Sequence, residues 1–592
     1  ANLLLRVPWK PLLQRLPGVW LLCMVPFSFL APVHFPALFA FWYAFLHLCF
    51  TANNFRSAYG VWVAYRSARA SSHTDWHAKY CQATGATDGS DTTCHDLPYD
   101  HIQHVIILPN YKENMDTLCE TLDVLASHSR ALTQYTICLA MEETEGGAVE
   151  KAQALVNQYG DEFYNITYTI HPKGRPNEIR GKSSNVAWAA AQMAARGGGS
   201  HAHILTVMDA DTCFAEDYFN SVAYHYTTST PEQRRIMMFA PSTVFDRNAK
   251  NVPVFVRVTD MFWAIGVMSN LYPGSAIKTP CSAYSVSMNL ALSVGFWDAG
   301  AEAIGEDLHM YLKCFFATDG RVIVKSIYSP ASQCNVEGEG DGMAGYVSGI
   351  RARYTQAKRH LWGSLDSGYA IRQAILAFCD SRDSSIKDPK AKEATAATRS
   401  PLMGSMLLFH LFHRLFEAHI LMGHLCMLIV ASTIIVPESA ASLLYPLQQR
   451  VWALLTGSAL GAAPPVSPYV MFALNFGFWV RLISLPPQLT MIRFYEKYQN
   501  WVGRERWALQ TKEMPLPSYA TGAAARYLGK RPQLCSLREY PRCLLDWAMI
   551  PFAGFAFYVA PQYHVHVAQL FTDSLEYKVA AKPSLDRHPP AH

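Results

Sequence analysis

The sequence is short of charge. Only 16% of its 592 residues are Asp, Glu, Lys or Arg, whereas 50% are hydrophobic. A soluble protein carries about 25% charged residues, so the deficit indicates that part of the chain lies in a membrane. The net charge of +4 is too small to indicate a nucleic-acid partner. The chain is also too long for one hydrophobic core, and we expect two or more structural units.

Cysteine motifs and a secretory signal are missing as well. The 14 cysteines include no C-x-x-C pair and no other spacing typical of a metal site, and unpatterned cysteines are typical of a reducing compartment. The first apolar stretch has no signal-peptidase pattern of small residues, and a second apolar block follows it at once. We therefore expect no cleaved signal peptide.

Long apolar stretches are present at both ends of the chain. Residues 17–50 are nearly free of charge and exceed the roughly 20 residues of one membrane-spanning helix. Two short spans with a break near residues 31–33 fit best, and one long tilted helix is the alternative. The pattern of residues 402–416 predicts an amphipathic helix on the membrane surface. Further spans are predicted over residues 417–436, 467–486 and 543–560.

The distribution of positive charges predicts which ends of these spans face the cytosol. Arg6, Lys10 and Arg15 precede the first span, and residues 490–542 are basic, so both segments should be cytosolic. We therefore expect an integral, multi-pass membrane protein whose central domain is cytosolic. The plasma membrane and the Golgi both fit this topology. The predicted organisation is a transmembrane hairpin (1–63), a cytosolic domain (64–380), a charged linker (381–400), and an interfacial helix with C-terminal transmembrane helices around the basic cytosolic loop (401–592).

The central region alternates strands with helices. The strands are predicted over residues 104–108, 136–141, 164–170, 203–208, 236–240 and 321–328. The helices are predicted over residues 115–128, 148–158, 183–196 and 214–228. This alternation predicts an α/β, Rossmann-like domain with a largely parallel sheet. Ligands of such sheets bind beyond the carboxyl ends of the strands.

Two aspartates, Asp209 and Asp211, follow the strand predicted at 203–208. Carboxylates held this close repel each other, and a cation would relieve the repulsion. Oxygen ligands favour Mg²⁺ or Mn²⁺, which typically bind one or two carboxylates together with substrate phosphates. The alternative is a turn or a helix cap, where aspartate is common.

Four other segments accompany this D-x-D pair in a recognisable order: "VIILPNYKEN", "TICLAMEETEGG", "RGKSSNVAWAA" and "AIGEDLHMYLK". From about residue 102 to 365 the chain resembles the family 2 glycosyltransferases, especially the membrane-embedded cellulose, chitin and hyaluronan synthases. The resemblance implies a GT-A catalytic domain, a nucleotide-sugar donor, a carbohydrate acceptor, and Mg²⁺ or Mn²⁺ as cofactor.

The resemblance also implies roles for the first two segments. Pro109, Tyr111 and Glu113 match the loop that grips the nucleotide base and ribose. Glu142 and Glu143 stand where the family usually has an aspartate that contacts the nucleotide, and either of them could serve. On structural grounds alone, the first segment reads as a turn from strand to helix.

The third segment and the D-x-D pair would hold the donor's diphosphate. Lys182 and Asn185 match the family's Lys-x-x-Asn, near the phosphates, although the neighbouring serines could simply cap a helix. In the family, the positions of Asp209 and Asp211 hold the metal that bridges the phosphates. Asp209 would therefore also contact the nucleotide-sugar.

The last two segments would carry catalysis and the acceptor. Asp307 matches the catalytic base and Glu306 its neighbour, although an acidic pair also suits the first turn of any helix. The segment "QAKRHLWG" resembles the Q-x-x-R-W signature of processive synthases, which lies near the acceptor and the diphosphate. Its residues are Gln356, Arg359, His360 where tryptophan is expected, and Trp362. Either His360 or Trp362 could stack on a sugar.

The sequence thus predicts an inverting glycosyltransferase that moves sugar from a nucleotide-sugar, with UDP favoured, to a growing β-linked polysaccharide at the membrane. One alternative is a single transfer to a lipid acceptor. The other is an inactive homologue that serves as a membrane scaffold subunit. Membrane lipids are expected contacts, and the sequence does not address the oligomeric state.

Overall fold

The computed structural model describes residues 9–85, 96–197, 202–340, 342–387, 401–435, 453, 466–510, 537–538 and 542–575. The chain divides into two compact units. The first, which we call the helical unit, consists of Ala1–Ala58, Ser367–Met491 and Gly554–Asp573. The second, the sheet unit, consists of Tyr59–Asp366, Ile492–Ala553 and Ser574–His592.

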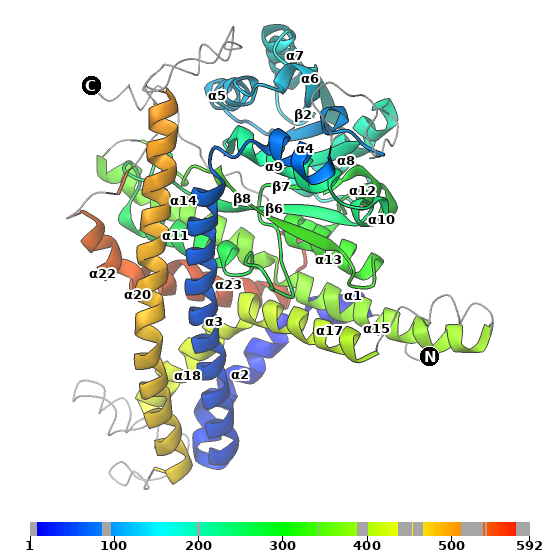
Figure 1. The fold of residues 1–592 in the computed structure, drawn as a ribbon. Helices are drawn as coiled ribbons and strands as arrows, with labels where there is room; N and C mark the ends of the chain where they lie inside the picture. Colours follow the sequence, from blue (N-terminus) through cyan, green and yellow to red (C-terminus); the bar gives the residue numbers. More distant parts are fainter. Residues whose placement is uncertain are drawn as a thin grey trace. The chain divides into compact units, whose positions relative to one another are not determined.

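The sheet unit is built on eight strands in the order β3-β2-β1-β4-β7-β6-β8-β5 (Figure 1). Their bounds are β1 Gln103–Pro109, β2 Tyr135–Glu142, β3 Asn165–His171, β4 His203–Val207, β5 Cys213–Phe214, β6 Met237–Val244, β7 Tyr284–Ser287 and β8 Ile323–Ser332. All six strands predicted from the sequence are present. The short strands β5 and β7 were not predicted.

The strand directions make this a mixed sheet. β3, β2, β1 and β4 run parallel, and β6 and β8 also pair in parallel. β7 lies antiparallel between β4 and β6, and β5 is antiparallel to β8. The α/β GT-A-like fold class is therefore confirmed, while the sheet is less parallel than expected. β7 has only four residues, two of them serines, so it gives little strand signal.

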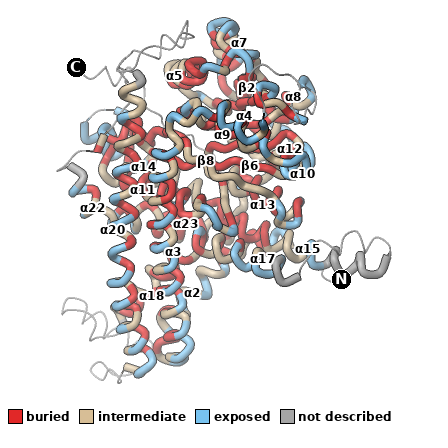
Figure 2. The backbone as a smooth tube through the Cα atoms, in the orientation of Figure 1, coloured by how far each residue is buried: buried red, intermediate tan, exposed pale blue. Residues whose placement is uncertain are grey.

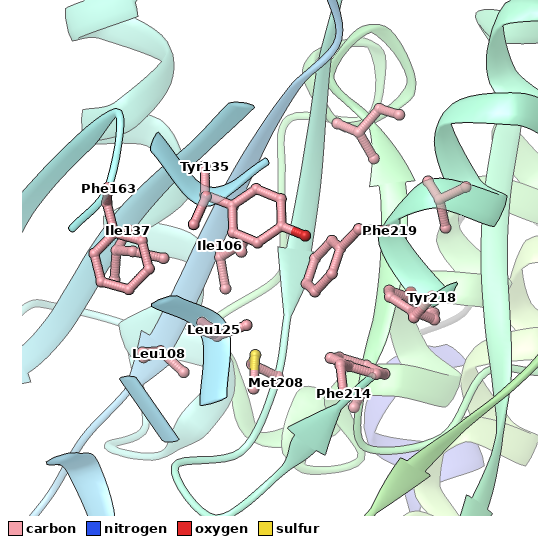
Figure 3. Close-up of a cluster of buried hydrophobic side chains, with 14 of the residues drawn as sticks. Ile106, Leu108, Leu125, Tyr135, Ile137, Phe163, Met208, Phe214, Tyr218 and Phe219 are labelled. Carbon is pink, nitrogen blue, oxygen red and sulfur yellow. The ribbon is translucent and has the colours of Figure 1, made fainter. Parts of the chain in front are cut away.

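Helices cover both faces of this sheet. α5 (Met115–Ala126), α7 (Ala148–Tyr159) and α9 (Glu216–Thr227) contribute to one large apolar cluster with alternate residues of β1 and β2 (Figure 3). Alternate strand residues point to one face, so these helices share that face. α8 (Lys182–Gly197) packs against β1, β2 and β3, and its apolar residues lie outside this cluster, which places it on the opposite face.

This topology brings several chain segments to one edge of the sheet. The carboxyl ends of β1, β2, β4, β6 and β8 all lie there, because those strands point the same way. The antiparallel β7 begins at the same edge, since Tyr284 pairs with Val207 at the end of β4. β2 and β6 are buried along their whole length (Figure 2), so the edge is carried by a rigid core.

The remaining elements of the sheet unit connect or extend this core. They are α4 Trp76–Thr84, η2 Tyr99–His101, α6 Ala131–Gln134, α10 Pro231–Arg234, α11 Val254–Met268, α12 Met288–Ser293, η3 Ala301–Ile304, α13 Glu306–Ala317, α14 Gly342–Trp362 and α22 Arg542–Gly554. The helices predicted at 115–128, 148–158, 183–196 and 214–228 correspond to α5, α7, α8 and α9.

The helical unit begins with a reversal of the chain. α2 (Leu16–His34) ends at Phe35 and α3 (Pro36–Ser71) starts at the next residue, a little after the break expected at 31–33. The rings of Trp20 and Trp42 lie 6.1 Å apart, so the two helices fold back on each other. A single long helix across residues 17–50 is thereby excluded.

Other helices complete this unit. They are α1 Trp9–Gln14, α15 Leu365–Lys387, α17 Pro401–Phe416, η4 Glu417–Leu421, α18 Met422–Ile435, η6 Phe555–Val559 and α23 Ala560–Gln569, together with the first part of α20 Pro468–Gln510. Residues of α2, α3, α18 and α20 share one apolar cluster. Large apolar side chains such as Phe41, Phe472 and Trp479 stay exposed, as expected of helices that face lipid.

Four described helices are long and apolar enough to cross a membrane: Leu16–His34, Gly404–Ile434, Pro468–Ala508 and Leu544–Gln569. This indicates an integral membrane protein. The segment 402–416, expected to lie apart on the membrane surface, continues through the π-helical turn η4 into α18. α15 runs into the expected linker as far as Lys387, and α20 runs into the expected basic loop as far as Gln510. Residues 388–400 and 511–536 lie outside the described residues.

Candidate active site

Three acidic or basic side chains predicted from the sequence meet at the carboxyl edge of the sheet. Asp209 follows the end of β4, Lys182 opens α8, and Glu306 opens α13. The Lys182 Nζ atom lies 2.8 Å from Asp209 Oδ1 and 2.8 Å from Glu306 Oε1. Burial alone would lower the pKa of Lys182, but the two carboxylates raise it. Lys182 is therefore a fixed positive charge between two acids.

Ser282, just before β7, joins this group to Asp307. Its backbone N–H donates to Asp307 Oδ2 at 2.7 Å, and its hydroxyl donates to Asp209 Oδ2 at 2.5 Å. Its carbonyl accepts a hydrogen bond from Lys182 Nζ at 2.6 Å. The second oxygen of Asp307 accepts from the N–H of Leu308 at 2.8 Å, within the first turn of α13. One residue thus touches the D-x-D aspartate, the lysine and the expected catalytic base.

Glu306 is the buried member of this group of acids. Its Oε2 atom accepts a hydrogen bond from the Tyr284 hydroxyl at 2.9 Å, and that hydroxyl accepts from Trp297 Nε1 at 2.6 Å. Burial raises the pKa of Glu306 to about 7; Lys182 opposes this rise and Asp307 adds to it. The side chain is only 5% exposed, so Glu306 serves the site through its neighbours.

The two aspartates of the D-x-D pair have different surroundings. Asp209 is 28% exposed at its side chain, whereas Asp211 is buried. Asp211 Oδ2 accepts a hydrogen bond from the N–H of Cys334 at 3.3 Å, and its carbonyl accepts one from the buried Arg247. Arg247 in turn pairs with Glu120. Asp209 therefore presents its carboxylate outward, and Asp211 anchors the loop.

These residues fit an open cation site. Asp209 Oδ1 lies 2.8 Å from Lys182 Nζ, and Asp209 Oδ2 accepts a hydrogen bond from the Ser282 hydroxyl, so both oxygens of this carboxylate are held in place. Carboxylate oxygens are ligands that a hard cation accepts. Within the described ranges, no three His, Cys, Asp or Glu side chains form a closed metal cage. Mg²⁺ and Mn²⁺ prefer oxygen ligands, such as the Asp209 carboxylate together with the phosphate oxygens of a bound substrate.

The residues expected around the nucleotide form a separate charged network. The Arg180 guanidinium lies over the Tyr111 ring, 4.3 Å from its centroid. Glu142 is buried at the end of β2 and lies 3.1 Å from His171 Nδ1, while His171 Nε2 contacts Glu178 at 3.0 Å. Burial would lower the pKa of His171, but the two glutamates raise it. The Glu142 carboxylate is therefore already engaged by the His171 ring.

Three other expected nucleotide residues have local roles in the structure. Glu143 is exposed and accepts a hydrogen bond from the N–H of Lys173 at 2.6 Å. Pro109 is the last residue of β1, and the Glu113 carbonyl accepts from Lys151 at 2.9 Å. Glu143 is thus more open to a ligand than the buried Glu142.

Asn185 is buried and faces the sheet. Its side-chain amide donates to the Ala140 carbonyl of β2 at 2.8 Å. This bond holds α8 against β2 and thereby fixes Lys182 one turn earlier. The Lys-x-x-Asn segment therefore combines one residue that faces the acid cluster with one that secures the helix.

The Q-x-x-R-H segment lies in the last turns of α14. Gln356 accepts a hydrogen bond from the buried Arg353, and Arg359 is half-buried. The His360 ring meets Trp263 of α11 edge to face, with centroids 4.6 Å apart. Trp362 is only 3% exposed, so it cannot stack on a sugar in this structure. The half-buried aromatic beside His360 is Trp263, which no sequence motif indicated.

A buried ionic triad braces α13, the helix that carries Asp307. His309 Nδ1 lies 2.6 Å from Asp366 Oδ1, and its Nε2 lies 3.1 Å from Asp298 Oδ2. Lys313 also pairs with Asp298, at 2.5 Å. Burial would lower the pKa of His309, but Asp366 and Asp298 raise it to about 9. The imidazolium is therefore an internal charge that ties α13 to the start of α15.

The triad predicts a pH-dependent stability. Because the folded pKa of His309 lies above its ordinary value of about 6.5, its contribution is complete below pH 6.5 and disappears as the pH rises through 9. We expect the melting temperature of the wild type to fall over this window, and the His309→Gln variant to lack that part of the fall. Thermal unfolding at pH 6.0 to 9.5 measures the difference. Parallel curves for the two proteins would contradict the assignment.

Sequence reasoning missed several residues of this site. Ser282, Tyr284 and Gln333 lie in segments that looked like loop or strand end, and they reach the acids only because β7 and β8 bring them to the edge. His309 follows the Glu-Asp pair by two residues, which was a usable signal for a supporting role. Asp366 lies 57 residues further on, and its contact could come only from the fold.

An α/β sheet with paired aspartates at its carboxyl edge, beside a Glu-Asp pair that opens a helix, fits a GT-A-like domain. Residues 204–464 match the family model described as "Glycosyl transferase family group 2", which spans somewhat less than half of the chain. The chain therefore contains a glycosyltransferase family 2 domain together with candidate membrane helices, and the protein is a glycosyltransferase. The interpretation as an inactive scaffold subunit is not retained.

Comparison with known proteins adds little about the substrate. None of the curated proteins matches the chain. Similar solved structures include the mannosyltransferase PcManGT from Pyrobaculum calidifontis in complex with GDP-Man and Mn²⁺, with 14% identity, a TM-score of 0.36, and coverage of 74% of this chain and 99% of that one. Residues 1–349 of S. aureus TarS give 10% identity, a TM-score of 0.29, and coverage of 67% and 92%. At such TM-scores the likeness carries no argument about donor, metal or acceptor.

Proposed function

We propose that this enzyme is an inverting transferase that moves sugar from a UDP-sugar to a growing β-linked polysaccharide, with its sheet unit in the cytosol. The observation that carries the proposal is the convergence of Asp209, Lys182 and Asp307 on Ser282, within hydrogen-bond distance of its atoms. A metal-ligand candidate, a fixed cation and a candidate base thus lie within one small volume. This is the set of groups needed to displace a diphosphate from a sugar.

The proposed step is a single displacement. An acceptor hydroxyl gives its proton to the Asp307 carboxylate while its oxygen bonds to the anomeric carbon. The bond between that carbon and the diphosphate oxygen breaks, and UDP leaves with the electron pair. Attack on the face opposite the leaving group inverts the anomeric centre. Lys182 lies where it can offset negative charge on the diphosphate.

A divalent cation would be held by the outward carboxylate of Asp209, with Asp211 behind it. Bound Mg²⁺ or Mn²⁺ would supply charge neutralisation for the departing diphosphate. The protein's own contribution is to orient Asp209 through Lys182 and Ser282. Tyr111, Arg180 and Glu143 are proposed to lie along the nucleotide, because they are the accessible groups at the ends of β1 and β2 and before α8.

A second candidate function is the transfer of a single sugar to a lipid acceptor. It is favoured by the burial of Trp362 and by the histidine at position 360, since processive synthases use an aromatic there to hold the sugar chain. If a polysaccharide is made, Trp263 is the residue we propose for that stacking, because it is half-buried and borders His360.

The experiment that tests the function is a donor panel. Purified full-length protein in detergent is incubated with Mn²⁺ and a series of UDP-, GDP- and other nucleotide-sugars, and nucleotide release and product size are measured. We expect release from a UDP-sugar and a ladder of oligomers or a polymer. A single-sugar glycolipid would favour the second candidate, and release only from a donor other than a UDP-sugar would contradict the donor assignment.

A further inference from the structure

Ser282 has a backbone conformation that serine rarely adopts. Its φ is +63°, in the left-handed region, where residues other than glycine are uncommon. The N–H of Ala283 donates to the Cys281 carbonyl at 2.6 Å across it, which closes a tight three-residue turn. Such strain persists only where surrounding contacts impose it, and it often marks a functional position.

The hydrogen bonds of Ser282 divide into two sets. The backbone set comprises the N–H that donates to Asp307 and the carbonyl that accepts from Lys182. A glycine would form both of these bonds and would adopt this φ without strain. The side-chain set needs the hydroxyl, which donates to Asp209 Oδ2 at 2.5 Å and accepts from Gln333 Nε2 at 3.1 Å. A serine side chain is therefore required for the bonds to Asp209 and Gln333.

The hydroxyl fixes the plane of the Asp209 carboxylate. Lys182 holds Oδ1 at 2.8 Å, and the Ser282 hydroxyl holds Oδ2. Gln333, at the end of β8, fixes the hydroxyl's own direction because its amide fills an acceptor position of the oxygen. The outer lone pairs of Asp209 thus have a set direction before any ligand arrives. Hydrogen bonds of this kind orient ligating carboxylates and contribute to metal affinity.

We infer that Ser282 is a positioning residue for the divalent cation: its side chain aims Asp209, while its backbone sets the distance from Asp209 to Asp307. This inference rests on the proposed function, since it needs a cation at Asp209. Ser282 makes no bond or proton transfer with substrate. Its role is to hold the carboxylates of Asp209, which follows β4, and of Asp307, in the first turn of α13, in a fixed relation.

The test compares Ser282→Gly and Ser282→Ala with the wild type. Binding of Mn²⁺ to the purified full-length protein is followed by electron paramagnetic resonance in the presence of saturating UDP. Loss of a partner of a ligating carboxylate typically weakens metal binding by about 10–100-fold, and we expect this loss in both variants. The melting temperature of Ser282→Gly should equal or exceed that of the wild type, because glycine relieves the strained φ.

Ser129→Ala is the matched control. The Ser129 hydroxyl and N–H both contact Glu216, so this serine also binds a carboxylate, outside the acid cluster. Its Mn²⁺ binding should equal that of the wild type. Unchanged Mn²⁺ affinity in Ser282→Gly and Ser282→Ala would overturn the inference, provided that Asp209→Asn loses the binding. If Asp209→Asn binds Mn²⁺ as the wild type does, the cation assignment of the proposed function falls, and the role of Ser282 falls with it.

Discussion

Replacement of Asp307 by asparagine is expected to lower kcat by about 10²–10⁴-fold, the usual contribution of a general base. Asparagine keeps the size of the side chain and an oxygen that can accept from the N–H of Ser282 or Leu308. It cannot take up the proton of the acceptor hydroxyl. The fold and the Mn²⁺ affinity should therefore persist while sugar transfer nearly stops. The measurement is the rate of nucleotide release at saturating donor and metal.

The control for this variant is Asp319→Asn, which removes a carboxylate just after the end of the same helix. Its kcat should lie within about twofold of the wild-type value, since surface substitutions away from a site have small effects. Asp307→Asn with more than a third of the wild-type kcat would show that another group takes the proton, and the assignment of Asp307 would be wrong.

Replacement of Lys182 by methionine is expected to have the largest effect on stability. The change leaves Glu306 buried and Asp209 partly buried without their shared cation. Removal of one partner of a buried ion pair typically costs about 3–5 kcal/mol in unfolding free energy. At pH 8, where Glu306 is mostly ionised given its pKa of about 7, the loss should be largest. Thermal unfolding in detergent at pH 6 and pH 8 measures it.

The double variant Lys182→Met/Glu306→Gln separates stability from chemistry. Glutamine removes the buried negative charge, so most of the lost stability should return, while sugar transfer should stay low because the diphosphate still lacks the lysine. Arg234→Met is a matched control, since it removes a buried cation that pairs with Asp96 in the same unit. It should lower stability without changing kcat of the folded protein. Full activity of Lys182→Met would contradict the proposed role.

Local sequence patterns were sufficient for the elements that carry the site. Apolar runs such as "HVIIL" and "TICLAM" are buried on both faces, so they predict strands from composition alone. Asp209 was found because paired acids at the end of a buried strand are conspicuous, whereas the role of Asp307 came from the resemblance to the family's motif. Their mutual proximity depends on the antiparallel β7 and on the start of α13, because Ser282, just before β7, contacts both aspartates.

The rest of the site depends on contacts between distant segments. β7 is short and rich in serine, so no local pattern places Ser282 beside Asp209, 73 positions earlier. A left-handed φ at a serine has no local signature. The burial of Asn185 and Trp362 depends on how α8 and α14 pack, and motif matching treats such positions as if they faced a ligand.

In the membrane region, too, local patterns predicted the helices but not the contacts between distant segments. Apolar length predicted spans over residues 17–50, 417–436, 467–486 and 543–560, and each of these overlaps a helix that is long and apolar enough to cross a membrane. Apolar length did not predict that residues 402–416 would continue into the next span. The connection is a π-helical turn, which has no characteristic amino-acid composition. Arg481 interrupts the apolar block at 467–486 and is paired with Tyr43 and His47 of α3, a partner that only the fold supplies.

The most direct test of the central claim is to locate a bound cation and nucleotide. Full-length protein with UDP and Mn²⁺ can be studied by anomalous diffraction, or by cryo-electron microscopy with and without the metal. We predict Mn²⁺ density against the Asp209 carboxylate, with the diphosphate between it and Lys182 and with Asp307 on the side where an acceptor would enter. Density for metal and nucleotide elsewhere, with Asp209 still in contact with Lys182 and Ser282, would contradict the account.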